Sequence, residues 1–177
     1  AGWWGHAAPF EFTPDYRPAP GITRYLCGTQ PILSMTALDC GLDTLLAAQP
    51  LGGMAALRDK SLALTDLFIA LVEARCAGHG LGLATPREHA QRGSQVCLTR
   101  DTGAYAIVQA LIARGVIGDF RAGDPSRLAE VPHILRFGFT PLYLGFTEVF
   151  DAVEHLRQVL ASGEWKQSQF NQKAAVT

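Results

Sequence analysis

The sequence predicts an α+β fold in which helices cover one face of a small sheet. Two long helical patterns come first, strand-like runs appear only after residue 80, and the elements from there follow the order β-β-α-β-β-α. A loop-rich segment, residues 1–31, precedes all of them. With 177 residues, the chain is long enough to bury a substantial core without disulfides.

Residues 1–31 have no helical period and are rich in proline, glycine and aromatic residues. Proline and glycine fix turns, and a solvated linker does not normally carry so many aromatic rings. We therefore expect an ordered, loop-rich segment whose rings are covered.

The next two segments show helical spacing of apolar residues. One helix is expected over residues 34–47, with Ser34 as its N-cap. A longer helix is expected over residues 54–76, and Gly78 ends it. The apolar stripe of the longer helix follows the i, i+3, i+4, i+7, i+8 pattern: Leu64, Leu67, Phe68, Leu71 and Val72.

Four short runs after residue 80 are expected to be strands. They are residues 81–84, 95–99, 116–120 and 134–139. The clearest helical stripe of the chain lies between the second and third runs and ends at Gly115. The last helix is expected to begin with Thr147 as its N-cap and to end at Gly163.

The charge balance argues against nucleic-acid binding. The chain has 16 acidic and 15 basic residues, a net charge of −1 and only three lysines, whereas binding to phosphates needs clustered Lys and Arg. The hydrophobic share is 48%, but charged residues, Gly and Pro interrupt each apolar run before the roughly 18 to 20 residues of a membrane span. We expect neither a nucleic-acid partner nor a membrane.

The cysteines indicate a reducing compartment. Four cysteines occur with no CxxC pair and no secretory leader, so the cytoplasm is expected and each cysteine is interpreted as a small buried hydrophobe. The chain also opens Ala-Gly-Trp-Trp without an initiator Met, which suggests a piece of something longer.

The common signals for metal and nucleotide sites are absent. Cys76 and His79 have the spacing of metal ligands, but no second pair lies near them, so no metal is expected. The glycines of residues 78–82 follow a helix rather than a strand and are interpreted as a helix terminator. Neither a P-loop nor a Gly-x-Ser-x-Gly elbow occurs.

Two local features could carry chemistry. Residues 2–6, with residues 24–31, combine small residues with Trp, His and Thr donors that suit phosphate oxygens but serve equally well in packing and capping. Arg136 lies in an aromatic strand and needs an anionic partner. That partner is either the carboxylate of a ligand or an internal Asp or Glu.

Six motifs occur in order over nearly the whole chain, and together they resemble the C-terminal part of a kynureninase. The motifs are Gly-Trp-Trp-Gly-His (2–6), Gly-Ile-Thr-Arg-Tyr-Leu-Cys-Gly-Thr-Gln-Pro-Ile (21–32), Leu-Arg-Asp-Lys-Ser-Leu-Ala-Leu-Thr-Asp (57–66), Arg-Gly-Ser-Gln-Val (92–96), Arg-Gly-Val-Ile-Gly-Asp-Phe-Arg (114–121) and Leu-Arg-Phe-Gly-Phe-Thr-Pro-Leu-Tyr (135–143). Kynureninases are fold-type I pyridoxal-phosphate enzymes. They act as homodimers and hydrolyse L-kynurenine to anthranilate and L-alanine in tryptophan catabolism.

The resemblance implies roles for five residues. Trp3 and Thr29 match positions that reach the phosphate of pyridoxal 5'-phosphate across the dimer interface. Arg136 matches the arginine that holds the substrate α-carboxylate, and His6 and Trp4 lie near the aromatic ring of the substrate.

The sequence also departs from the family pattern. The lysine that forms the Schiff base with the cofactor precedes the first motif in the family, so the chain contains no catalytic residue. Trp4 stands where Phe is more usual, and extra residues occur around 123–132.

The resemblance implies a domain organisation and a function. Residues 1–31 are expected to end the large cofactor-binding domain, 32–50 to form a connecting helix, and 51–177 to form the small α+β domain. The partners would be the missing N-terminal portion, a second subunit and a small-molecule substrate, kynurenine or 3-hydroxykynurenine. Alone, the chain is expected to be inactive. The alternatives are a non-catalytic binding or scaffold module and another fold-type I pyridoxal-phosphate activity.

Overall fold

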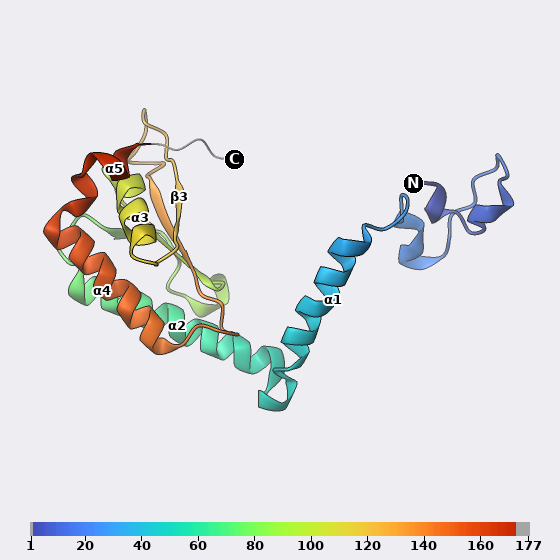
Figure 1. Ribbon diagram of the computed structural model, residues 1–177, viewed down its shortest axis with the longest axis horizontal. Helices are drawn as coiled ribbons and strands as arrows, with labels where there is room; N and C mark the ends of the chain where they lie inside the picture. The colour runs from blue at the N-terminus through green and yellow to red at the C-terminus, as the bar shows by residue number, and fades with distance from the viewer. Residues whose placement is uncertain (1, 173–177) are drawn as a thin grey trace. The chain divides into compact units, whose positions relative to one another are not determined.

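The computed structural model describes residues 2–172. Its internal contacts divide the chain into two compact units, Ala1–Gln49 and Pro50–Thr177 (Figure 1). Among the helices of the described residues, none combines the length and the apolar character that crossing a bilayer requires.

The first unit begins with three short 3-10 helices, η1 (Trp3–Gly5), η2 (Pro9–Glu11) and η3 (Gly21–Tyr25). Backbone hydrogen bonds tie the first helix to the residues between the other two, for example from Ala19 N to Gly5 O at 2.8 Å. Gly5 is buried, and a Cβ there would collide with the carbonyl oxygen of Arg24. The segment is therefore ordered without α-helix or strand, as the sequence indicated.

The aromatic rings of this segment are not covered as expected. The rings of Trp3, Trp4, Phe10 and Phe12 contact one another edge to face in series, yet Phe12 is 83% exposed. Burying an aromatic ring contributes about 2 kcal/mol or more. Within residues 2–172, most of the free energy that burial of these rings could contribute is therefore not gained.

The first unit ends with α1 (Ile32–Leu46). The helix starts before the predicted N-cap: Pro31 occupies the cap position, and its carbonyl accepts from Met35 N at 3.0 Å, so the prediction for Ser34 is wrong. Every residue of α1 is exposed. The large apolar ones are Ile32, Leu33, Met35, Leu38, Leu42, Leu45 and Leu46.

The second unit contains a four-stranded antiparallel sheet in the order β1-β2-β4-β3. Its strands are β1 (Gly82–Leu83), β2 (Gln95–Thr99), β3 (Asp119–Arg121) and β4 (Ile134–Gly138). The predicted α+β class and the β-β-α-β-β-α order are confirmed. The third strand starts at Asp119 rather than Val116, because Val116 N donates to Leu111 O and closes the preceding helix instead.

Four α-helices complete this unit, together with two 3-10 turns and a third, η4, that begins at the last residue of the first unit. The helices are α2 (Gly53–Arg75), α3 (Ala104–Ala113), α4 (Phe146–Ser162) and α5 (Ser168–Asn171), and the turns are η4 (Gln49–Leu51), η5 (His89–Gln91) and η6 (Glu164–Lys166). Figure 1 shows α2 and α4 side by side and α3 beside β3, in agreement with their contacts. The sequence did not predict α5.

One face of the sheet forms the core with these helices. Alternate strand residues such as Val96, Leu98, Leu135 and Phe137 are buried in one cluster with residues of α2, α3 and α4. The residues between them face the other way, because strand side chains alternate. That second face carries the polar residues of the candidate site.

The start of α4 differs from the prediction. Gly145 is the N-cap, and its backbone N–H donates to the Glu148 carboxylate at 3.0 Å. Thr147 already lies in the first turn, so its prediction as the N-cap is wrong. Gly163 has φ +70° and ends the helix as predicted.

Gly103, the N-cap of α3, is expected to be required for the stability of the fold. Gly103 has φ +72°, and a Cβ there would collide with the Trp165 ring. Gly103→Ala should lower the free energy of unfolding by about 2 kcal/mol or more, since backbone strain adds to the clash. Gly115→Ala is the matched control, because Gly115 has φ +85° with nothing near its Cβ position. Denaturant unfolding followed by circular dichroism compares the two, and equal losses would contradict the clash.

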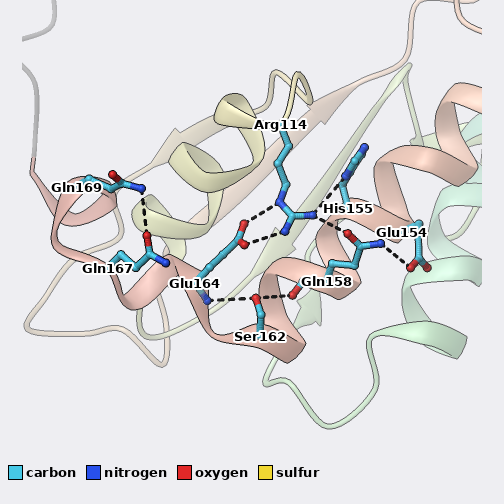
Figure 2. A network of polar contacts seen from close by, with 8 residues as sticks. All are labelled: Arg114, Glu154, His155, Gln158, Ser162, Glu164, Gln167 and Gln169. Carbon is cyan, nitrogen blue, oxygen red and sulfur yellow. Dashed lines mark hydrogen bonds and ion pairs between the residues drawn. The ribbon is translucent and has the colours of Figure 1, made fainter.

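An ion-pair network joins the end of α3 to α4 and η6. Arg114 donates from Nε and Nη2 to the two carboxylate oxygens of Glu164, each at 2.7 Å, and from Nη1 to Gln158 Oε1 at 2.7 Å. Figure 2 shows the guanidinium lying between these two acceptors. A bidentate pair of this kind fixes orientation as well as contributing energy.

This pair predicts a pH dependence of stability. The hydrogen bonds from Arg114 lower the pKa of Glu164 from its ordinary 4.5. A lowered folded-state pKa stabilises the fold above the unfolded value, and that contribution is lost as the pH falls through the folded value.

Glu164→Gln should therefore reduce stability at neutral pH. The difference from the unchanged chain should shrink as the pH falls below about 4.5, which unfolding midpoints measured across pH would show. Glu88→Gln removes the same charge from an exposed side chain that forms no ion pair within residues 2–172. This control variant should show the same pH dependence of the unfolding midpoint as the unchanged chain.

Candidate functional site

An open pocket of about 560 Å³ lies in the first unit. Its lining is mostly aromatic and proline side chains: Trp3, His6, Ala8, Pro9, Phe12, Thr13, Pro14 and Tyr16. A pocket of this size and character suits a small ligand with an aromatic ring. Two of the predicted site residues, Trp3 and His6, lie in this lining.

His6 is held by backbone groups on both sides of its ring. Its Nε2 lies 3.0 Å from Asp15 O, and its Nδ1 accepts from Ala8 N at 2.9 Å. Since Ala8 N must donate, Nδ1 carries no proton, and Nε2 donates to the carbonyl. The residue is buried. His6 therefore presents a ring to the pocket rather than a free nitrogen.

The two tryptophans have different surroundings. Trp4 is half-buried between Trp3 and Phe10, with ring centroids 4.4 Å and 5.5 Å away, and it does not line the pocket. Trp3 is 50% exposed. Of the two, Trp3 has the more accessible indole.

Trp3 and Thr29 retain unused donors. Within residues 2–172, neither the Trp3 indole N–H nor the Thr29 hydroxyl forms a hydrogen bond, and both residues are exposed. Gly2 backs directly onto the Cys27 carbonyl, where a Cβ would collide. This close approach places the start of η1 beside Cys27, two residues before Thr29. The donor chemistry fits a phosphate-like anion.

In the second unit, Arg136 lies on the half-exposed face of the sheet, opposite the face that packs in the core. The antiparallel register places it beside Cys97 of β2 and Asp119 of β3. Its Nη2 donates to Asp119 Oδ2, and Arg121 Nη2 forms an ion pair with the same oxygen at 2.8 Å. Of the two partners left open by the sequence, the internal carboxylate is therefore present.

Arg136 is nevertheless not fully engaged. Among the described residues, its only hydrogen-bond partner is Asp119, through Nη2, so Nε and Nη1 keep their donors. The side chain is 35% exposed. An arginine fork that is held at one nitrogen and free at the others can still receive a carboxylate.

A cluster that the sequence reasoning did not predict joins three of the motifs. The Ser61 and Ser94 hydroxyls lie 2.6 Å apart, Phe139 N donates to Ser94 O at 2.8 Å, and Lys60 Nζ donates to Pro141 O at 2.8 Å. These contacts fix the start of β2 and the end of β4 against α2. The cluster therefore holds the strand that carries Arg136.

An ion pair also joins α2 to the loop that precedes β2. The buried Arg92 pairs with Asp66, and His89 Nε2 lies 2.8 Å from the other carboxylate oxygen. Partial burial acts to raise the pKa of Asp66, but the hydrogen bonds from Arg92 and His89 outweigh it and leave the pKa lowered. The pair fastens the 86–94 loop to the helix.

No metal-ligand cluster is found in residues 2–172, counted as three or more His, Cys, Asp or Glu side chains placed to share an ion.

The cysteines differ in burial. Cys76 is buried at the end of α2, and burial raises the pKa of its thiol. Cys27 and Cys40 are exposed, so the expectation that every cysteine is a buried hydrophobe is wrong. Both lie in the first unit, which buries little side-chain surface.

The chain is similar to kynureninases along its whole length. The family model for the kynureninase C-terminal domain matches residues 57–156. Over its whole length the chain is 55% identical to kynureninases of Burkholderia mallei (strain SAVP1) and Burkholderia pseudomallei (strain 1106a), and 54% identical to the kynureninase of Pseudomonas fluorescens. It spans 39% of the length of each of these relatives.

Proposed function

The chain belongs to the kynureninase C-terminal domain family, and we propose that it works as the C-terminal portion of a pyridoxal-phosphate-dependent kynureninase. The reaction would be hydrolysis of L-kynurenine or 3-hydroxykynurenine to L-alanine and anthranilate or 3-hydroxyanthranilate. The observation that carries the proposal is the 55% identity, which extends over all 177 residues.

We assign the cofactor phosphate to Trp3 and Thr29. Their free, exposed donors are chemically suited to phosphate oxygens. Pyridoxal phosphate, when bound, supplies the electron sink for charge that develops at the substrate α-carbon. The contribution of these two residues would be to hold and orient the phosphate, which both would reach across the interface of a dimer.

Arg136 is assigned to the α-carboxylate of the substrate. Its unused Nε and Nη1 donors lie on a solvent-accessible face and suit a carboxylate. Fixing one end of the substrate in this way orients the bonds that react, which is worth several kcal/mol of barrier.

The pocket of the first unit is assigned to the aromatic ring of the substrate. His6 offers a ring locked by Asp15 and Ala8, so its role would be packing and shape rather than proton transfer. Trp4, which does not line the pocket, would act indirectly, by packing against Trp3 and holding it in place.

The exposed apolar surface supports a larger assembly. The leucines of α1 and the rings of residues 1–31 remain in solvent in the described chain, and exposed apolar surface on this scale marks an interface. We assign them to contacts with the preceding portion of the protein and with a second subunit. Residues 1–31 would belong to the cofactor domain, 32–50 to a connecting helix and 51–177 to the small domain.

The free cysteines suit a reducing compartment such as the cytoplasm.

The isolated chain is expected to have no kynureninase activity, because it lacks the lysine that tethers the cofactor. A chimera of the Burkholderia mallei kynureninase, in which this chain replaces the matching 39% of the relative, should be active. Kynurenine consumption and anthranilate fluorescence measure both, with the unmodified relative as control. A folded, cofactor-loaded chimera that turns over a different amino acid would favour another pyridoxal-phosphate activity. A chimera that binds no cofactor would favour a scaffold module.

A further inference from the structure

The carboxylate of Asp119 contacts two arginines on the half-exposed face of the sheet. Its Oδ2 accepts a hydrogen bond from Arg136 Nη2 and forms an ion pair with Arg121 Nη2 at 2.8 Å. The three side chains belong to the edge strand β3 and its neighbour β4, and Asp119 and Arg136 are direct partners in the register. The pairing is therefore set by the backbone ladder and not by a flexible loop.

This arrangement leaves Arg136 oriented but not neutralised. Two guanidinium groups share one carboxylate, so the trio has a net positive charge. Asp119 occupies Nη2 of Arg136, and Nε and Nη1 have no partner in residues 2–172. An anion that approaches the free edge meets a guanidinium whose plane is already fixed.

We propose that Asp119 is a positioning residue that aims the free edge of Arg136 at the substrate α-carboxylate. The inference rests on the proposed function, because it assumes that Arg136 receives that carboxylate. An arginine side chain has several rotatable bonds, and a fork held at one nitrogen loses less freedom when it binds. Water screens the charge of Asp119, which is 41% exposed, so its orienting effect outweighs its repulsion of the substrate.

The test is Asp119→Asn in the active chimera, assayed with L-kynurenine and with its α-carboxamide, which lacks the anionic group. KM for kynurenine should rise about tenfold while kcat changes less than about threefold, since orientation before binding is lost. KM for the carboxamide should stay unchanged. Asp119→Glu, which restores the charge, should recover part of the difference. Arg121→Gln, which leaves the Asp119–Arg136 pair in place, should change KM for kynurenine less than about threefold, as expected for an exposed ion pair.

Direct binding gives a readout besides turnover. Competition by L-alanine and by L-alaninamide, followed by the cofactor absorption of the chimera, should show weaker L-alanine binding in the Asn variant and unchanged L-alaninamide binding.

Three results would overturn the positioning role. They are an unchanged KM for kynurenine, tighter binding of the carboxylate ligands, or an equal loss for the acid and the amide. Arg136→Ala separates these failures from a failure of the proposed function. If that variant keeps its preference for the carboxylate, Arg136 itself has been misassigned.

Discussion

Arg136→Ala in the chimera should lower kcat/KM for L-kynurenine about 100-fold, with cofactor still bound. Hydrogen bonds to a charged group contribute about 1.5–3 kcal/mol, and the lost fork offers at least two donors to the carboxylate. Asp119 remains solvated and paired with Arg121, so the fold should survive. The measurement is steady-state kinetics together with the cofactor absorption band.

Arg121→Ala provides the matched control for this prediction. Arg121 contacts the same Asp119 oxygen, but its side chain is 60% exposed at the edge of the sheet. Its loss should change kcat/KM less than about threefold, as expected for an exposed pair. If both variants lose activity equally, the effect reports the charge of the face and not a specific contact. If neither does, Arg136 has only the internal pairing with Asp119.

Most of the second unit could be predicted because its elements follow simple periods. The alternation of Val96 and Leu98 with polar neighbours predicted β2 with the observed ends. The cap predictions failed for a local reason: a carbonyl can begin a helix without a side-chain cap, as Pro31 does for α1. Ser34 and Thr147 are suitable cap residues by type, but each lies inside the first turn of its helix.

The partners within the site could not be predicted from residue types. Whether Arg136 would meet an internal carboxylate depended on the register of β3 against β4, which sequence patterns do not specify when a long loop intervenes. The same holds for the pair between the buried Arg92 and the exposed Asp66, 26 positions apart. The unused donors of Trp3 and Thr29 could likewise be recognised only from the folded chain.

Phe68→Ala should cause the largest loss of stability in the second unit, about 3–5 kcal/mol. Phe68 is 1% exposed, and its ring lies 5.1 Å from the Phe137 ring and 5.0 Å from the Phe139 ring. It therefore joins α2 to the strand that carries Arg136. Truncation removes both contacts and leaves a cavity that the rigid sheet cannot fill.

The loss should be visible as a lower denaturant midpoint of the 177-residue chain, followed by circular dichroism. Phe150→Ala is the matched control: the same truncation in α4, at a ring that is 42% exposed and contacts Arg75. It should cost about 1 kcal/mol or less, because a half-exposed ring loses less burial and its removal leaves no enclosed cavity. Similar midpoints for the two variants would mean that the Phe68 contacts with β4 do not hold the sheet in place. The support inferred for Arg136 through α2 would then have to come from the Ser61 and Lys60 hydrogen bonds alone.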